Sequence, residues 1–293
     1  MDRRAGHVST GSIVIVADRS SLAPFAEAFL RARIGPATLL CLDDDASSFA
    51  PAVEEMAAAC RARIPSVKGN PIALAGARVI VLAPHGQGLA PILRVTGKLA
   101  EALGIFAPDA VVVVAAEPAV LPAVLARKAR LPVASVLGAG AAICAQRLRR
   151  RFARELGVAE AQVVVPALGG TGESLVVPEN GPRVAGIALD SFLPEERIAT
   201  EILVARSGPP ASCAELACWA ARATAAIVRG RREVMPAMAH VSIPGVRVGF
   251  LGVLARLGGA GIEDVLMPRL TERDRARLSR AAYAMDEQAS RLA

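Results

Sequence analysis

The stretch DAVVVVAAEP, residues 109–118, decides the fold of this 293-residue chain. Its valines and alanines are uninterrupted by polar side chains until the glutamate, which is typical of a strand buried on both faces of a parallel sheet. A helical pattern follows, then a short strand predicted over residues 133–137, a basic helix over 146–156 and a further strand over 162–168. Because strands and helices alternate, the sequence predicts an α/β protein with a doubly wound parallel sheet.

The same alternation extends upstream of this stretch. Buried strands are predicted over residues 12–16, 38–42 and 78–83, separated by helical or polar segments. The region after the central stretch has longer strands and a C-terminal helix instead. We therefore predict a degenerate dinucleotide-binding domain over residues 1–138 and a mixed α+β domain over residues 139–293.

Composition and charge limit the kinds of partner. Hydrophobic residues make up 53% of the chain, yet no apolar run reaches the roughly 18–20 residues that a membrane helix needs. The N-terminus lacks the apolar core of a signal peptide, so we expect a cytoplasmic protein with no membrane partner. The net charge of +7 favours a small anionic ligand. Without a nucleic-acid-binding motif we expect no nucleic-acid partner, and the scattered cysteines predict no metal site.

Three motifs resemble those of the malate/lactate dehydrogenase family. They are the pair Glu117-Pro118, the segment CAQR at residues 144–147 and the loop GGTGE at residues 169–173. The family has Asn-Pro, Asp-Ser-Ala-Arg and Gly-Gly-His-Gly-Asp at these places. The resemblance implies a Rossmann-like sheet followed by the C-terminal domain of these dehydrogenases, a cis peptide bond before Pro118, NAD-dependent oxidoreductase activity and a homodimer or homotetramer.

The substitutions within these motifs remove the family's acid/base chemistry. By the resemblance, Arg147 keeps the position that binds the substrate carboxylate. Thr171 replaces the histidine that takes the substrate proton, Cys144 replaces the aspartate that orients this histidine, and Glu117 replaces the asparagine that contacts substrate and nicotinamide. A threonine hydroxyl cannot shuttle a proton near pH 7, so we expect no hydride-transfer chemistry of the family's kind.

The turn after the first strand departs from the glycine-rich dinucleotide motif. Its sequence is ADRSSL, and Ala17, Arg19 and Leu22 occupy the glycine positions, where larger side chains would fill the space of a pyrophosphate. Asp18 adds a negative charge there. Asp43, after the second strand, lies at the spacing of a ribose-binding acid, although a polar loop explains it equally well. We expect no cofactor, with NAD or NADH the candidate if one binds.

The loop after the strand at residues 78–83 is shorter than the family's mobile lid, and it lacks the two lid arginines that the resemblance implies. This loop contains His85, which is either a solvent-exposed loop residue or a relocated base.

The basic helix gathers arginines on one side. Arg147, Arg150, Arg151 and Arg154 recur at helical spacing. These arginine side chains are either solvated and bound in ion pairs, or they form an anion-binding face.

Three functions remain open from the sequence. The first is a non-catalytic relative of malate dehydrogenase that binds, scaffolds or regulates a protein partner. The second is a remodelled oxidoreductase acting on a small 2-hydroxy or 2-oxo acid, with Arg147 binding the acid and His85, Glu117 or Glu173 as base. The third is different chemistry with Cys144 as nucleophile, its pKa lowered by Arg147.

Overall fold

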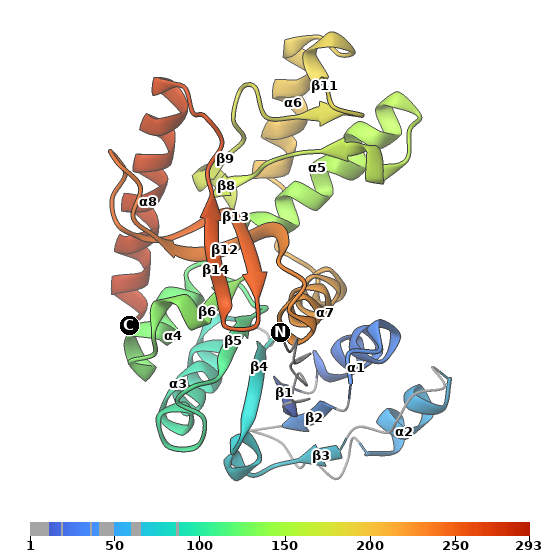
Figure 1. Ribbon diagram of the computed structural model, residues 1–293, viewed down its shortest axis with the longest axis vertical. Coiled ribbons are helices and arrows are strands. Elements are labelled where there is room, and N and C mark those ends of the chain that lie inside the picture. The colour runs from blue at the N-terminus through green and yellow to red at the C-terminus, as the bar shows by residue number, and fades with distance from the viewer. Residues whose placement is uncertain (1–11, 19, 36, 41–49, 60–65, 86–87) are drawn as a thin grey trace, which may run out of the picture.

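The computed structural model describes residues 12–18, 20–35, 37–40, 50–59, 66–85 and 88–293. The strands of the first part form a parallel sheet in the order β3-β2-β1-β4-β5-β6 (Figure 1). The chain moves outward from β1 to each edge in turn, so the predicted doubly wound α/β fold is confirmed. The strands are β1 (Ser12–Ala17), β2 (Ala37–Leu40), β3 (Ser66–Lys68), β4 (Ala77–Ala83), β5 (Val111–Val114) and β6 (Val136–Gly138).

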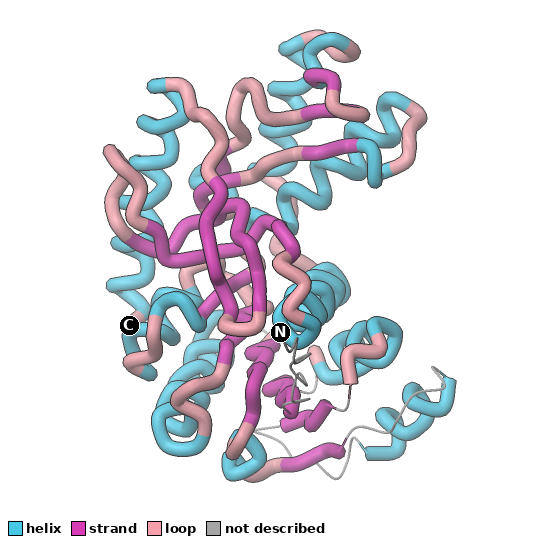
Figure 2. Tube along the Cα trace, in the orientation of Figure 1, coloured by secondary structure: helices cyan, strands magenta, loops and turns pink. Residues whose placement is uncertain are grey.

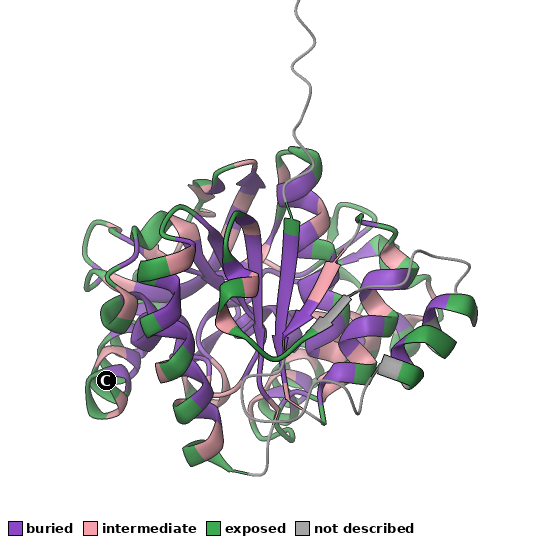
Figure 3. Ribbon diagram, turned by 90° about the horizontal axis from the view of Figure 1, so that it is seen from below, coloured by how far each residue is buried: buried purple, intermediate pink, exposed green. Residues whose placement is uncertain are grey.

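Helices cover this sheet on both sides. α1 buries Leu22, Phe25 and Phe29 because these apolar residues recur at helical spacing. α3 and α4 pack together and lie to the left of the parallel strands in Figure 1, whereas α1 lies to the right. Figure 3 shows the strands buried at the centre and the exposed residues on the outer faces of the helices. The helices are α1 (Leu22–Ala32), α2 (Ala50–Ala59), α3 (Leu89–Phe106) and α4 (Leu121–Ala129).

The sheet continues beyond β6 into antiparallel strands in the order β12-β13-β8-β9, with β14 beside β13 (Figure 2). Met238 of β12 pairs with Gly138 of β6, which joins the two parts. A separate small sheet has the order β11-β10-β7. The strands are β7 (Val163–Val164), β8 (Leu168–Gly169), β9 (Leu175–Val176), β10 (Arg183–Val184), β11 (Ile187–Ala188), β12 (Glu233–Val241), β13 (Gly249–Gly258) and β14 (Gly261–Leu266).

The helices of the second part do not all stay with its strands. α7 packs against α1 and contacts β4 and β5, so it returns to the parallel sheet. α8 begins at the N-cap Thr271, whose hydroxyl accepts a hydrogen bond from the Asp274 N–H at 3.1 Å. In the described part of the chain no helix is both long and apolar enough to span a membrane. The helices are α5 (Ala141–Leu156), α6 (Glu195–Arg206), α7 (Cys213–Arg229) and α8 (Glu272–Leu292).

Three expected elements differ from those observed. Residues Val133–Ser135 form a 3-10 turn, closed by the Ser135 N–H on the Pro132 carbonyl, and only β6 after it is a strand. The single strand expected over residues 162–168 is two strands in different sheets, because Pro166 between them lacks the N–H that a ladder requires. The basic helix α5 begins at Ala141, earlier than the sequence predicts.

The antiparallel strands approach each other closely at Gly252 of β13, which pairs with Gly169 of β8. An added Cβ at Gly252 would lie 2.7 Å from the Ala141 Cβ and 2.8 Å from the Gly169 carbonyl oxygen. Gly252→Ala should therefore lower the free energy of unfolding by about 1–3 kcal/mol, measured by urea denaturation. Gly249→Ala is the control on the same strand, since nothing lies within 4 Å of its added Cβ. Equal losses in the two variants would contradict this packing.

Candidate functional site

A cavity of about 590 Å³ lies where strands of the parallel sheet end. It brings together His85, which follows β4, Glu117, which follows β5, and three side chains from the second part, Cys144, Arg147 and Thr171. Five of the positions predicted as catalytic therefore line one cavity, although they come from sequence segments far apart. Glu173, the other candidate base, is exposed and does not line it. The other lining residues are Gly88, Leu89, Ile92, Pro118, Ile143, Gly172, Ala205, Arg206, Gly208, Pro209, Pro210, Ala211 and Gln288.

Local structure explains how these side chains reach the cavity. The Glu117-Pro118 peptide bond is cis, as the resemblance implies. Cys144 and Arg147 are one helical turn apart on α5, so they share a face. Thr171 follows a tight turn in which Gly169 has φ of +80°, and an added Cβ at Gly169 would lie 2.2 Å from the Ser174 carbonyl oxygen. Only glycine fits there.

The guanidinium of Arg147 is bound by the chain itself. Its Nε donates to Glu215 Oε1 at 2.8 Å and its Nη2 to Glu215 Oε2 at 2.7 Å, which is a bidentate ion pair. Nη1 also donates to the Pro209 carbonyl at 2.6 Å and Nη2 to the Pro210 carbonyl at 3.0 Å. The ion pair lowers the pKa of Glu215 to about 2. The carboxylate of Glu215 thus takes the hydrogen-bond donors of Arg147 that the resemblance assigns to a substrate carboxylate.

Glu215 has a second role at the start of α7. Its Oε2 accepts a hydrogen bond from the backbone N–H of Ser212 at 2.9 Å, and the Ser212 hydroxyl oxygen accepts one from the Glu215 N–H at 3.3 Å, which forms a capping box. The sequence analysis missed this residue. The pattern Ser-x-x-Glu could have shown the cap, but it gives no sign of the contact with Arg147, which is far away in sequence.

The other arginines of α5 are mostly paired as well. Arg150 Nε lies 3.1 Å from Glu160 Oε1, and Arg151 Nη1 lies 3.0 Å from Glu201 Oε2. The interpretation of this side of the helix as paired and solvated therefore agrees with the structure better than an open anion-binding face does.

A second carboxylate of the chain, that of Asp18, accepts hydrogen bonds in the turn after β1. Dinucleotide-binding domains bind a phosphate at this turn. Asp18 Oδ1 accepts hydrogen bonds from the backbone N–H groups of Ser20 and Ser21, at 3.1 and 3.0 Å, and Oδ2 accepts from the N–H of His85 at 2.7 Å. Hydrogen bonds from both serines and from His85 lower the pKa of Asp18, although burial opposes them. The N–H groups at the start of α1 are therefore already bound, and these residues do not fit a pyrophosphate.

The residues predicted at the cofactor positions lie in several environments. Ala17 ends β1 and is buried, and Leu22 is 1% exposed in the main core under α1. Leu22 thus packs inward instead of standing in the turn. Arg19 and Asp43 lie outside the described residues. The sequence analysis noted the charge of Asp18 but not its hydrogen bonds.

Burial changes the acid/base character of two residues that line the cavity. It raises the pKa of Glu117, against a hydrogen bond from the Ala211 N–H and the charge of Arg147. It also raises the pKa of Cys144 to about 11. The expected lowering of the Cys144 pKa is therefore wrong, because the thiol is 5% exposed and the nearby guanidinium is neutralised by Glu215.

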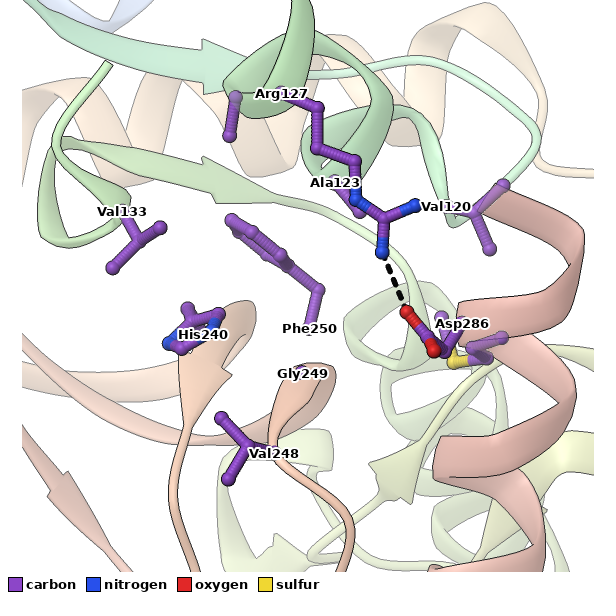
Figure 4. A pocket seen from close by; sticks show the side chains of 11 residues that line it. Val120, Ala123, Arg127, Val133, His240, Val248, Gly249, Phe250 and Asp286 are labelled. Atoms are coloured by element: carbon purple, nitrogen blue, oxygen red, sulfur yellow. Dashed lines mark hydrogen bonds and ion pairs between the residues drawn. The ribbon is translucent and has the colours of Figure 1, made fainter. Parts of the chain in front are cut away.

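A smaller cavity of about 190 Å³ lies elsewhere, between α4, the β12–β13 hairpin and α8 (Figure 4). His240 packs edge-on to Phe250 there, and Arg127 pairs with Asp286. It contains none of the predicted site residues. The described residues also include no group of three or more His, Cys, Asp and Glu side chains that could hold a metal ion.

The doubly wound sheet, with a cavity at the carboxyl ends of its strands, defines a doubly wound α/β protein. Comparison with known proteins shows that the chain is homologous to malate and lactate dehydrogenases. No family model matches it.

Similarity to curated proteins covers part of the chain. It is 32% identical over 203 residues to the malate dehydrogenase of Chloroherpeton thalassium, a match that spans 63% of each protein. It is 29% identical over 241 residues to the malate dehydrogenase of Thermomicrobium roseum, covering 73% of this chain and 76% of that protein.

Similarity of fold covers nearly the whole chain. The lactate dehydrogenase of Cryptosporidium parvum, solved with lactic acid and nicotinamide adenine dinucleotide, superposes with a TM-score of 0.88 at 19% identity, over 96% of this chain and 98% of that one. The apo malate dehydrogenase of Picrophilus torridus has a TM-score of 0.86 at 19% identity, over 96% and 97%.

The lowered pKa of Glu215 predicts how stability depends on pH. The folded pKa of about 2 lies below the ordinary value of 4.5, so the ion pair stabilises the fold above pH 4.5 and this contribution is lost as the pH falls toward 2. The unfolding free energy should therefore decrease less on acidification in E215Q than in the unmodified chain. We expect the difference to be about 1–2 kcal/mol, allowing for solvent screening. Urea denaturation between pH 2.5 and 7 measures this. E173Q, an exposed glutamate, is the control, and an unchanged pH slope in E215Q would contradict the assignment.

The burial of Cys144 predicts low thiol reactivity. Iodoacetamide at pH 8 should alkylate Cys144 much more slowly than the exposed Cys218, because Cys144 is both inaccessible and protonated. Mass spectrometry of tryptic peptides over a time course gives the two rates. Faster labelling of Cys144 would revive the nucleophile hypothesis.

Proposed function

We propose that this protein is a non-catalytic relative of malate dehydrogenase that serves a binding, scaffolding or regulatory role. One observation supports this above all. The chain's own carboxylates, Glu215 and Asp18, bind the groups that would bind a substrate acid and a cofactor phosphate.

The contact at Arg147 is difficult for a substrate to displace. A guanidinium has five N–H donors, and four hydrogen bonds already run from Arg147 to Glu215, Pro209 and Pro210. A substrate carboxylate that binds bidentately must take the place of Glu215. Removing one partner of a partly buried ion pair strongly destabilises a protein, so the free energy of binding would have to offset that loss.

The turn at Asp18 opposes a cofactor in the same way. A pyrophosphate would meet an ionised carboxylate within a few ångströms, and like charges repel strongly at that distance in a half-buried site. Leaving the turn would also cost Asp18 its hydrogen bonds from Ser20, Ser21 and His85.

The cavity also lacks an acid/base pair of the expected kind. Thr171 cannot transfer a proton near pH 7, and the Cys144 thiol stays protonated. A remodelled oxidoreductase is the second candidate. Its support is that His85 lines the same cavity as Glu117 and Arg147. Homology to the dehydrogenases supports a homodimer or homotetramer, and we propose that the protein acts in the cytoplasm, with another protein as the possible target of its regulation.

The decisive prediction concerns the cofactor. NADH up to millimolar concentrations should produce neither a saturable fluorescence change nor a thermal shift. A ligand present at one hundred times its dissociation constant would stabilise the fold by about 2.7 kcal/mol, which a thermal shift detects. The lactate dehydrogenase of Cryptosporidium parvum, which was solved with nicotinamide adenine dinucleotide, is titrated in parallel as the positive control. Saturable binding to this chain would overturn the proposal and favour the oxidoreductase, with His85→Asn as the next variant to test.

A further inference from the structure

The cavity at the strand ends has an unusual distribution of charge. Its arginine at position 147 forms a bidentate pair with Glu215, so that charge is compensated within the wall. Glu117 on the other wall forms no ion pair with any described residue. No described side chain donates a hydrogen bond to its carboxylate, although the nearby backbone N–H of Ala211 favours its charged form.

A carboxylate in this position is incompletely satisfied. It has about four lone-pair sites, and no described side chain donates to them. Glu117 is half-buried. Removing a carboxylate from water without a partner is unfavourable, and a cationic donor would relieve that cost. Of the cationic side chains that line the cavity, Arg206 is held elsewhere, since its Nε and Nη2 both donate to the Leu175 carbonyl, at 3.3 and 3.0 Å.

From these contacts we propose that the cavity binds a small organic amine whose ammonium group donates to the Glu117 carboxylate. The inference rests on the proposed loss of dehydrogenase function and names the ligand class of that same site. A substrate-like acid is disfavoured there, because it would face Glu117 and would find Arg147 already paired.

The walls indicate the rest of the ligand. Apolar side chains surround the cavity from three segments, including Leu89 and Ile92 of α3, Ile143 of α5 and the Pro209-Pro210 loop. A volume of about 590 Å³ is in the range of small-molecule sites. The ligand is therefore a monoamine with an alkyl or aryl body and not a highly charged polyamine.

The test uses matched probes on the full chain. Benzylamine, cyclohexylamine and isoamylamine are titrated by calorimetry and thermal shift near pH 7.5, beside the alcohols and carboxylic acids of the same skeletons. At least one amine should bind about tenfold or more tightly than its alcohol and its acid, the difference expected for a charge-assisted contact. Binding of none of the amines, or equal binding of an acid, would overturn the proposal.

Variants then locate the contact. E117Q keeps the shape of the side chain and removes its charge, so amine affinity should fall by about tenfold or more. E173Q, an exposed glutamate outside the cavity, should leave it unchanged. Amine binding that persists in folded E117Q would overturn the assignment to Glu117. The comparison of amine with acid on the unmodified chain still decides the question if E117Q does not fold, and the NADH titration independently tests the proposed function.

Discussion

The bidentate pair between Arg147 and Glu215 is the interaction on which the site depends. It connects α5, in the second part of the chain, to the first turn of α7, which packs against α1 and the parallel sheet. The same carboxylate caps α7 through Ser212. Arg147 also binds the carbonyls of Pro209 and Pro210, which fixes the segment that precedes the helix. One ion pair therefore sets both the electrostatics and one wall of the cavity.

The start of α7 connects this pair to the second internal carboxylate. Cys213, next to the cap, places its Sγ 4.0 Å from the Ser21 carbonyl oxygen, at the turn that Asp18 binds. Asp18 in turn reaches the N–H of His85 after β4. The turn after β1, the loop after β4 and the first turn of α7 are thus held together by the chain's own groups. The first turn of α7 therefore contacts both internal carboxylate sites, Glu215 through its own chain and the Asp18 turn through Cys213.

Much of the fold could be predicted from the sequence because alternating buried strands and helices have few stable arrangements. The fold brings the motif residues Glu117, Cys144, Arg147 and Thr171 to one cavity. Glu215 could not be predicted, since its contact with Arg147 joins positions that no local pattern relates. The expected pKa of Cys144 failed for the same reason. That prediction considered the charge of Arg147 but neither the carboxylate of Glu215, which neutralises this charge, nor the burial of the thiol.

Among the proposed roles, the cavity beside Glu117 favours binding over scaffolding alone. The space is open to solvent, so close packing does not require that it be filled. A half-buried carboxylate without an ionic partner nevertheless costs free energy that an apolar side chain would not. Here the anion-binding groups are satisfied internally, while about 590 Å³ of space remains beside Glu117. A site whose anion-binding groups are bound within the chain, and whose cavity remains open, can take a ligand of a different kind. This combination supports the proposal that the cavity binds a small molecule whose charge is opposite to that of an acid.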